Sequence, residues 1–244
     1  MRQGIFTILE NRALNRRYHL LRLGGDSRGF TAPGQFADIQ VPGFYLRRPF
    51  AVCDWEEDFF TVLYECVGKG TERLKALGPG TPLDVLTGLG NGYSLQGAGE
   101  TPLLVGGGCG VGSLYGLAKH MLRQGLTPRV ILGFPCREEI SLWEEYRALG
   151  LEPTVTTADG SFGIRGLVTE AMDIPHSSVY ACGPEPMLRA VAAKGPAGGQ
   201  LSFDARMGCG FGACMGCTRQ TVHGPRRVCK DGPVFRKEEI LWED

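Results

Sequence analysis

The sequence lacks the features that mark several special classes of protein. It has no net charge, because 26 lysines and arginines balance 26 aspartates and glutamates, so nothing favours binding to nucleic acid or to an anionic membrane surface. Its N-terminus has no apolar stretch of signal-peptide length. The longest uncharged run, residues 101–118, contains six glycines, which indicates a strand-to-helix loop rather than a membrane span. We therefore expect a cytoplasmic protein.

Disulfide bonds are not expected either, although the chain has nine cysteines. A secreted disulfide scaffold is normally much shorter, and an odd number leaves at least one thiol unpaired. Free or metal-bound thiols in a reducing compartment fit better. An apolar fraction of 43% and a charged fraction of 21% are ordinary for a globular protein. The 37 glycines in 244 residues are about twice the average usage, which predicts backbone turning tightly around ligands.

Short β-like runs separated by turn residues fill the chain up to about Gly99. Their spacing predicts an antiparallel β-barrel over residues 1–99. One helix, residues 71–77, interrupts the strands, with Thr71 as its N-cap and Gly78-Pro79-Gly80 as its stop. The predicted strands are Gly4–Leu9, Tyr18–Leu23, Gln35–Val41, Phe59–Val67 and Pro82–Leu86.

Strands and helices alternate after Gly99, which predicts a parallel sheet with helices on both faces over residues 100–197. A glycine-rich stretch, Lys194–Gly199, indicates a loop between domains. Residues 198–244 form a third, short domain, so the fold class is multi-domain, with β followed by α/β. The predicted strands are 103–105, 129–134, 154–157 and 179–181, and the predicted helices are 111–123, 138–149 and 185–193.

Four cysteines near the C-terminus carry the strongest functional signal. Cys209, Cys214, Cys217 and Cys229 have the spacing C-x4-C-x2-C-x11-C, which is the plant-ferredoxin order of ligands around a [2Fe-2S] cluster. Glycines between them let the loop turn its N–H groups toward sulfur. A structural zinc site is the alternative, although its usual mark is two C-x2-C pairs and this segment has one. By their positions alone, the other five cysteines are small buried side chains: Cys53, Cys66, Cys109, Cys136 and Cys182.

Two segments of the predicted barrel suit a pyrophosphate. Arg47-Arg48-Pro49-Phe50-Ala51 offers an arginine that can clamp a phosphate with two hydrogen bonds. Gly68-Lys69-Gly70-Thr71 opens a helix, whose N-terminal N–H groups favour an anion. Each segment alone is also compatible with plain turn and cap chemistry.

A glycine-rich turn after a strand, Leu103–Ser113, is a candidate for binding a second dinucleotide. It lacks the G-x-G-x-x-G spacing, so close packing of a helix on a strand explains it equally well. At the end of the next strand, Arg137 could favour a ribose 2′-phosphate, whereas Glu138 or Glu139 could bind a free 2′-hydroxyl. A solvated helix cap explains the same charges, and the residues leave the choice between NADP and NAD open.

Together these motifs resemble the ferredoxin-NAD(P) reductase superfamily, in which an Arg-x-[Tyr/Ser/Phe]-[Ser/Thr] strand holds FAD. The segment Tyr180–Met187 is similar to the superfamily's Cys-Gly-Pro-x-x-Met element beside nicotinamide. The strings Met207–Cys217 and Val228–Phe235 resemble the electron transfer subunits of NAD-dependent dihydroorotate dehydrogenase B, and the likeness covers essentially the whole chain.

The resemblance implies an FAD-binding barrel at 1–99, an NAD-binding domain at 100–197 and a [2Fe-2S] domain at 198–244. It places FAD at Arg48, Pro49, Phe50, Ala51, Leu63, Tyr64, Glu65, Gly70 and Thr71. It places NAD at Gly106, Gly107, Gly108, Gly110, Cys182, Gly183 and Pro184, and the cluster at the four cysteines Cys209, Cys214, Cys217 and Cys229.

The chain departs from the family pattern at three places. Ala51 stands where relatives often have a Ser or Thr that contacts the flavin N5, so only its backbone N–H is available. Glu65 stands near a family arginine. Gly88-Leu-Gly-Asn-Gly-Tyr93 resembles a family turn, with Thr87-Gly88 in place of Gly-Pro.

The resemblance also implies a function in pyrimidine biosynthesis. Electrons would pass from the FMN of a catalytic subunit that oxidises dihydroorotate, through the [2Fe-2S] cluster and FAD, to NAD+, in a heterotetramer with two copies of each subunit. Small subunits of NADPH-ferredoxin oxidoreductases, sulfide dehydrogenases and hydrogenase diaphorases share the three-part plan and remain alternatives. A redox sensor without turnover is an alternative from another class. No residue of this chain is expected to be a general acid or base.

Overall fold

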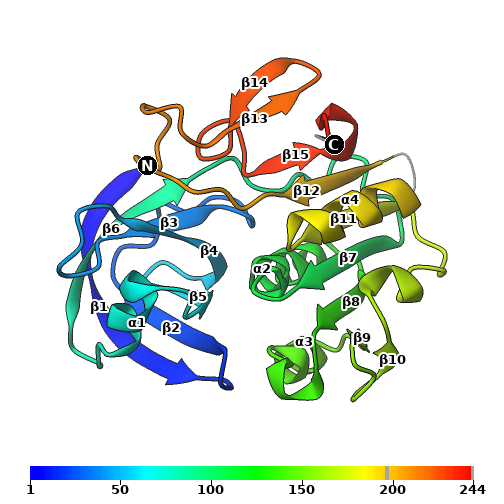
Figure 1. The fold of residues 1–244 in the computed structure, drawn as a ribbon, viewed down its shortest axis with the longest axis horizontal. Helices are drawn as coiled ribbons and strands as arrows, with labels where there is room; N and C mark the ends of the chain where they lie inside the picture. The colour runs from blue at the N-terminus through cyan, green and yellow to red at the C-terminus, as the bar shows by residue number, and fades with distance from the viewer. Residues whose placement is uncertain (196–197, 243–244) are drawn as a thin grey trace.

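A β-barrel and an open sheet lie side by side in the computed structural model, which describes residues 1–195 and 198–242. Within these residues, six strands close into an antiparallel barrel in the order β1-β2-β5-β4-β3-β6 (Figure 1). The sequence-predicted barrel is therefore confirmed. Its elements are β1 (Arg2–Ala13), β2 (Tyr18–Gly24), β3 (Phe36–Ile39), β4 (Arg48–Trp55), β5 (Phe59–Glu65), α1 (Lys69–Lys75) and β6 (Pro82–Leu89).

Alternation along the barrel strands sorts their side chains between an inner and an outer face. On β3, Ala37 and Ile39 belong to the barrel core with Phe50 and Tyr64. Phe36, one residue before Ala37, instead packs outside, against the C-terminal segment. The outer face of β3 is thus a contact surface between the barrel and the cysteine-bearing tail.

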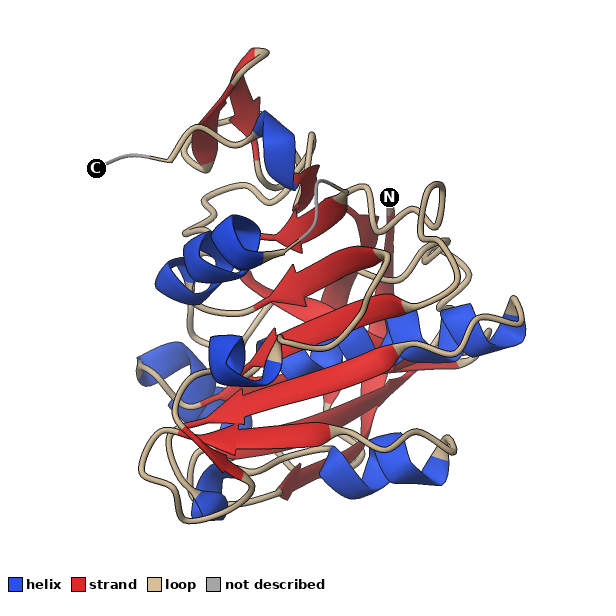
Figure 2. Cartoon of the chain, turned by 90° about the vertical axis from the view of Figure 1, so that its right-hand side faces the viewer, coloured by secondary structure: helices blue, strands red, loops and turns tan. Residues whose placement is uncertain are grey.

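The second half of the chain forms a sheet of parallel strands, as predicted, with one antiparallel strand at its edge. In the described residues its order is β10-β9-β8-β7-β11-β12-β15. The helices α2 and α3 cover one face and α4 the other (Figure 2). The strands are β7 (Pro102–Gly107), β8 (Arg129–Phe134), β9 (Thr154–Thr157), β10 (Ile164–Arg165), β11 (Ser178–Cys182), β12 (Gly199–Ser202) and β15 (Val234–Arg236), and the helices are α2 (Gly110–Arg123), α3 (Trp143–Ala148) and α4 (Glu185–Lys194).

Helix α2 joins the two halves, because it lies between the sheet and the barrel (Figure 1). A Cβ at Gly112 would lie 2.5 Å from the Cys53 sulfur, and a Cβ at Gly116 would lie 2.5 Å from the Cys53 carbonyl oxygen. Only glycine at these two positions allows the helix to approach β4 so closely.

The C-terminal segment belongs to both halves. Strand β12 pairs with β11 and, on its other side, with β15 near the C-terminus. Between them the chain returns toward the barrel and forms the hairpin of β13 (Thr218–Thr221) and β14 (Gly224–Arg227), seen above both halves in Figure 1. The predicted third domain at 198–244 therefore shares a sheet with the predicted second domain.

Several predicted elements differ from the structure. The pattern gave no strand at residues 48–55, where β4 lies, because Pro49 and a bulge between Val52 and Asp54 interrupt the alternation. The predicted helix 138–149 is shorter: a 3-10 turn at Arg137–Glu139 precedes α3, and Leu142, with a left-handed φ of 57°, separates them. Helix α1 is capped by Gly68 rather than by Thr71. The predicted loop Lys194–Gly199 holds the last residue of α4 and the first of β12, and its residues 196–197 lie outside the described part.

In the parts of the chain that the structure describes, no helix is long and apolar enough to cross a membrane.

Candidate functional site

Four thiols gather where the C-terminal segment returns to the barrel. All nine cysteines lie in the described residues, and none forms a disulfide. The backbone N–H groups of Ala213 and Cys214 donate to the Cys209 sulfur at 3.2 and 3.4 Å, and the N–H of Cys229 donates to the Cys217 sulfur at 3.4 Å. The loop therefore brings the cysteines together as two pairs, Cys209 with Cys214 and Cys217 with Cys229.

The two pairs differ in their surroundings. Burial would raise the pKa of Cys209, but hydrogen bonds from the N–H groups of Cys214, Phe211 and Ala213 outweigh it and lower this pKa to about 6. Burial and the neighbouring Cys217 raise the pKa of Cys229 to about 12. These hydrogen bonds favour the thiolate form of Cys209, which is the form that binds metals.

This arrangement fits a [2Fe-2S] cluster better than a single zinc ion. Each iron of such a cluster takes two thiolates, and the four thiols form two pairs. Zinc requires its ligands to surround one point. The N–H groups aimed at sulfur suit either metal, and the C-x4-C-x2-C-x11-C order of the cysteines favours the cluster.

The candidate flavin site lies at one end of the barrel, where Arg48 of β4 reaches α1. A Cβ at Gly70 would lie 2.7 Å from Nε of Arg48, so the guanidinium rests directly on the helix backbone. Its Nη1 donates to the carbonyl oxygens of Leu46 and Arg47 at 2.6 and 3.2 Å. The structure therefore brings together the two segments that the sequence nominated for a pyrophosphate.

The remaining flavin candidates divide between the two faces of the barrel wall. Phe50 and Tyr64 are buried in the barrel core, and the Tyr64 hydroxyl donates to Oδ1 of Asn11 at 2.8 Å. Ala51 is exposed, whereas Leu63 packs outside the barrel against α2. Only the outward-facing residues can offer side chains to a ligand, while Phe50 and Tyr64 can offer backbone alone.

Thr71 stabilises the start of α1 from the third helical position and not as the predicted N-cap. Its hydroxyl accepts hydrogen bonds from the N–H groups of Val67 and Gly68 at 2.9 and 3.2 Å and donates to the Gly68 carbonyl at 3.1 Å. The side chain thereby fixes the first turn of α1, which leaves it no free donor for a phosphate.

Glu65 takes part in a bridge between the two halves. Arg17, at the β1–β2 turn, pairs with Glu65 at 2.8 Å and with Glu139 at 2.9 Å. Glu139 was one of the two carboxylates predicted to bind a ribose hydroxyl, and in the structure it is paired with Arg17. Nothing in the local sequence around Arg17 indicated this role, because its partners are far away along the chain.

The candidate nicotinamide residues meet at the carboxyl ends of two adjacent strands. Gly106 of β7 pairs with Cys182 of β11. The chain order runs from β7 outward to β10 on one side and from β11 to β12 on the other, so the strand order reverses between β7 and β11. Open α/β sheets bind ligands at this topological switch point.

Some of these glycines are explained by the chain itself. A Cβ at Gly110 would collide with the Cys182 carbonyl, and a Cβ at Gly107 would lie 2.5 Å from the Met187 sulfur. Close packing of the two turns therefore requires glycine at 110, whereas the flexible Met187 side chain could move away from a Cβ at 107. Contact of both glycines with NAD stays a prediction. Burial raises the pKa of Cys182 to about 11, so its thiol is protonated at neutral pH.

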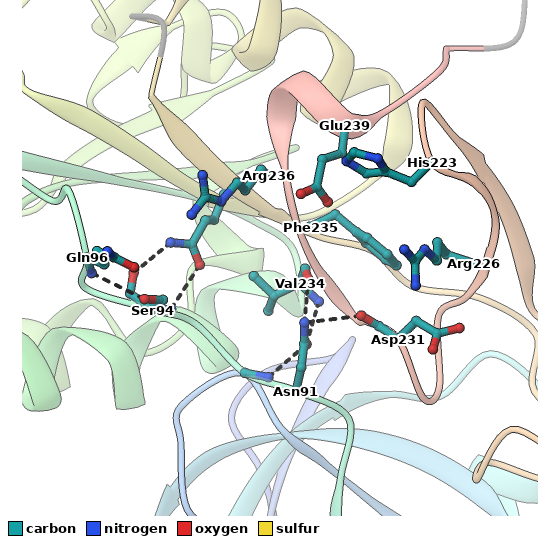
Figure 3. Close-up of a pocket in the computed structure, with 12 residues that line it drawn as sticks. Asn91, Ser94, Gln96, His223, Arg226, Asp231, Val234, Phe235, Arg236 and Glu239 are labelled. Carbon is teal, nitrogen blue, oxygen red and sulfur yellow. Dashed lines mark hydrogen bonds between the residues drawn. The ribbon is translucent and has the colours of Figure 1, made fainter.

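Asn91 anchors the tail to the loop between the two halves. Its side-chain amide donates to the Val234 carbonyl at 2.7 Å and to the Asp231 carbonyl at 3.3 Å, and it accepts from the Val234 N–H at 3.1 Å (Figure 3). The residue sits in the turn Gly88–Tyr93 that resembles a family motif, so a sequence signal existed, but its purpose was not evident. Beside it lies a polar cleft of about 260 Å³.

The C-terminal hairpin is also tied to the candidate nicotinamide element. Arg219 of β13 donates to Glu185, the first residue of α4, at 3.1 Å, and this contact lowers the pKa of Glu185. The Arg219 guanidinium lies 4.0 Å from the Phe203 ring centre. No motif in the sequence indicates this role of Arg219.

Known proteins resemble this chain over nearly its whole length. Residues 204–241 match a family described as the iron-sulfur cluster binding domain of dihydroorotate dehydrogenase B. The chain is 41% identical to the "Dihydroorotate dehydrogenase B (NAD(+)), electron transfer subunit" of Bacillus caldolyticus, over 96% of this chain and 97% of that protein. It is 36% identical to the protein of the same name from Bacillus pumilus, over 98% of each chain.

Solved structures agree on the fold. A structure described as an NADH-dependent reduced ferredoxin-NADP oxidoreductase superposes with a TM-score of 0.89 and 27% identity, over 98% of this chain and 90% of that one. Phthalate dioxygenase reductase superposes with a TM-score of 0.64 and 17% identity, over 79% and 64% of the two chains, which shows the fold alone. Because the curated relatives match over nearly their full length at 36–41% identity, the chain belongs to the family of electron transfer subunits of dihydroorotate dehydrogenase B (NAD(+)).

Proposed function

We propose that this oxidoreductase subunit links a partner that oxidises dihydroorotate, and that carries FMN, to NAD+ as the final acceptor. The observation that carries the proposal is the position of the two thiol pairs. They lie in the segments before and after the β13–β14 hairpin, which pack on the outer face of the barrel whose β4 bears Arg48. A cluster site and a flavin site on one barrel are what an electron transfer subunit needs.

The residues of the chain would hold the cofactors in the following way. Cys209 and Cys214 would bind one iron, and Cys217 and Cys229 the other. Arg48, with the backbone at Gly70, would hold the FAD pyrophosphate. When bound, FAD supplies the exchange between two-electron chemistry with a nicotinamide and one-electron chemistry with an iron–sulfur cluster.

The outer barrel wall and the sheet edge would orient the two dinucleotides. Pro49 and Ala51 would face the flavin, with Ala51 offering its backbone N–H, and the strand backbone at Leu63 and Glu65 would lie beside it. The glycines of residues 106–110 and the turn Cys182-Gly183-Pro184 would receive NAD at the switch point between β7 and β11. We assign no general acid or base, because dihydroorotate oxidation belongs to the partner.

We further propose a cytoplasmic location and a complex of two copies of each subunit. Nine free thiols support a reducing compartment. The complex is supported by the family relatives, whose name describes them as one subunit of a larger enzyme.

An anaerobic titration of the purified chain with NADH, with NADPH in parallel, tests the cofactor assignment. We expect a flavin band and a longer-wavelength iron–sulfur band, both of which bleach with NADH. A colourless protein that contains zinc after anaerobic preparation would overturn the FAD and [2Fe-2S] assignments. It would favour the alternative of a sensor without turnover.

A second assay tests the partner. Co-expression with a candidate catalytic subunit should give dihydroorotate-dependent reduction of NAD+ that is lost when this chain is left out. The 27% identity to the ferredoxin-NADP oxidoreductase structure supports a second candidate function, a small subunit of that enzyme class. Ferredoxin-linked turnover with a different large subunit, without dihydroorotate activity, would favour it.

A further inference from the structure

Asp38 is a buried carboxylic acid that the proposed function does not use. It lies on β3 with 2% of its surface exposed, and its Oδ1 has no hydrogen-bond partner among the described residues. No ion pair with Asp38 occurs in the same part of the chain. The nearby Arg47 is engaged elsewhere, because its guanidinium pairs with Asp84 at 2.8 Å and reaches only the backbone carbonyl of Asp38, at 3.5 Å.

Such a group is costly to the fold. A carboxylate removed from water without a partner destabilises a folded protein. The fold gains no ion pair from it, and an apolar side chain could fill the same place. An unsatisfied buried polar atom in a native structure requires an explanation.

The position of Asp38 supplies that explanation. On one side, β3 pairs Asp38 with Pro49 of β4, next to Arg48 of the flavin candidates. Ala37 and Ile39 point into the barrel core, so the Asp38 side chain points out of it, toward the cysteine loop. There a Cβ at Gly210 would collide with Oδ2 of Asp38, and Gly210 follows Cys209 directly.

Gly210 is shaped for this contact. Its φ is +76°, a conformation that glycine adopts without strain, and its missing side chain allows the loop backbone to lie directly on the carboxylate. The Cys209 sulfur and the Asp38 carboxylate interact as like charges. The Asp38 carboxylate therefore lies against Gly210, the residue that directly follows the cluster ligand Cys209.

We propose that Asp38 acts on the cluster site through Cys209, because its carboxylate places a negative charge beside this ligand. This inference rests on the proposed [2Fe-2S] assignment. A negative charge at low effective dielectric favours the oxidised form of a neighbouring redox centre, because reduction adds a second negative charge. Asp38 therefore keeps the reduction potential of the cluster low.

The test is the midpoint potential of the cluster in Asp38→Asn, which keeps the shape of the side chain and removes its charge. Anaerobic redox titration of the intact complex at pH 8, followed by the electron paramagnetic resonance signal of the reduced cluster, gives the value directly. We expect the ratio of reduced to oxidised cluster at a fixed potential to rise about tenfold, which is about 59 mV for a one-electron couple. The control is Asp58→Asn, which removes the same charge from the exposed β4–β5 turn and should leave the potential unchanged.

A second variant examines the contact from the loop side. Gly210→Ala keeps the carboxylate but places a Cβ against it, at a backbone angle that alanine rarely adopts, and should raise the potential in the same direction. If Asp38→Asn fails to fold, the potential measured in Gly210→Ala tests the role of Asp38 instead.

Two results would contradict the inference in different ways. A cluster potential that is unchanged in both variants would overturn the role of Asp38 and leave the proposed function intact. Absence of iron and acid-labile sulfide from the unmodified complex would overturn the proposed function itself, and Asp38 with it.

Discussion

At the scale of single residues, the backbone determines the chemistry of the thiols. Cys209 and Cys229 lie on either side of the β13–β14 hairpin, and hydrogen bonds lower the pKa of the first whereas burial raises that of the second. The spacing of the cysteines could be read from the sequence because a cluster needs ligands at short, fixed intervals. Arg17 and Asp38 could not be found in this way, because their partners lie more than forty residues away along the chain.

Replacing Cys229 tests the ligand set. Cys229→Ser removes the buried thiol that pairs with Cys217, so we expect loss of the iron–sulfur absorbance with FAD content unchanged. Iron, labile sulfide and flavin per protein are the measurements. Cys136→Ser, in the loop after β8, is the matched control and should keep its iron. Stoichiometric iron and sulfide in Cys229→Ser would show that the ligand set is wrong.

Arg48 is the residue whose loss should affect FAD most. Arg48→Ala removes a charged donor to the pyrophosphate, and such hydrogen bonds contribute about 1.5–3 kcal/mol, or roughly 10- to 100-fold in Kd. The flavin-to-protein ratio after gel filtration measures the effect. The exposed Arg28, which pairs with Asp26, provides the control variant Arg28→Ala. An unchanged ratio in Arg48→Ala would remove this residue from the site.

At the scale of elements, helix α2 is the joint between the barrel and the sheet. Its existence and start could be predicted, since glycines after a strand and an apolar periodicity are local signals. No local signal explains the glycines at 112 and 116. They are needed because a Cβ at either position would collide with Cys53 on β4. Strand β4 was not predicted, because Pro49 and the bulge break the two-residue alternation on which strand prediction depends.

Gly112→Ala measures how tightly α2 packs on the barrel. In an isolated helix this change stabilises by about 1 kcal/mol. Here the added Cβ would lie 2.5 Å from the Cys53 sulfur and 3.0 Å from Leu63, and overpacking of this kind costs about 1–3 kcal/mol. We expect a net decrease in the free energy of unfolding, measured by chemical denaturation. Gly78→Ala, where a Cβ meets nothing within 4 Å, is the control, and equal stability of the two variants would contradict the packing argument.

At the scale of the whole molecule, the C-terminal segment holds the three functional regions in one arrangement. It adds β12 and β15 to the sheet, places its cysteines on the barrel, and ties its hairpin to α4 through Arg219. The order of the three parts was visible in the sequence, because each has its own pattern. Their mutual placement was not, since it depends on contacts such as those of Asn91, which join residues about 140 positions apart.

Asn91→Ala should therefore loosen the tail without affecting the barrel. The change leaves the Val234 N–H and the Val234 carbonyl without their side-chain partners, and losses of this kind cost about 1–3 kcal/mol each when the groups are buried. Because β15 lies at the edge of the sheet, we expect faster proteolytic cleavage after β12, with the barrel retaining FAD. Limited proteolysis followed by mass spectrometry locates the cleavage. Gln96→Ala changes a residue that lines the same cleft but makes no side-chain hydrogen bond within the described residues, so it should be cleaved at the unmodified rate. Equal rates for all three proteins would show that β12 and β15 hold the tail without Asn91.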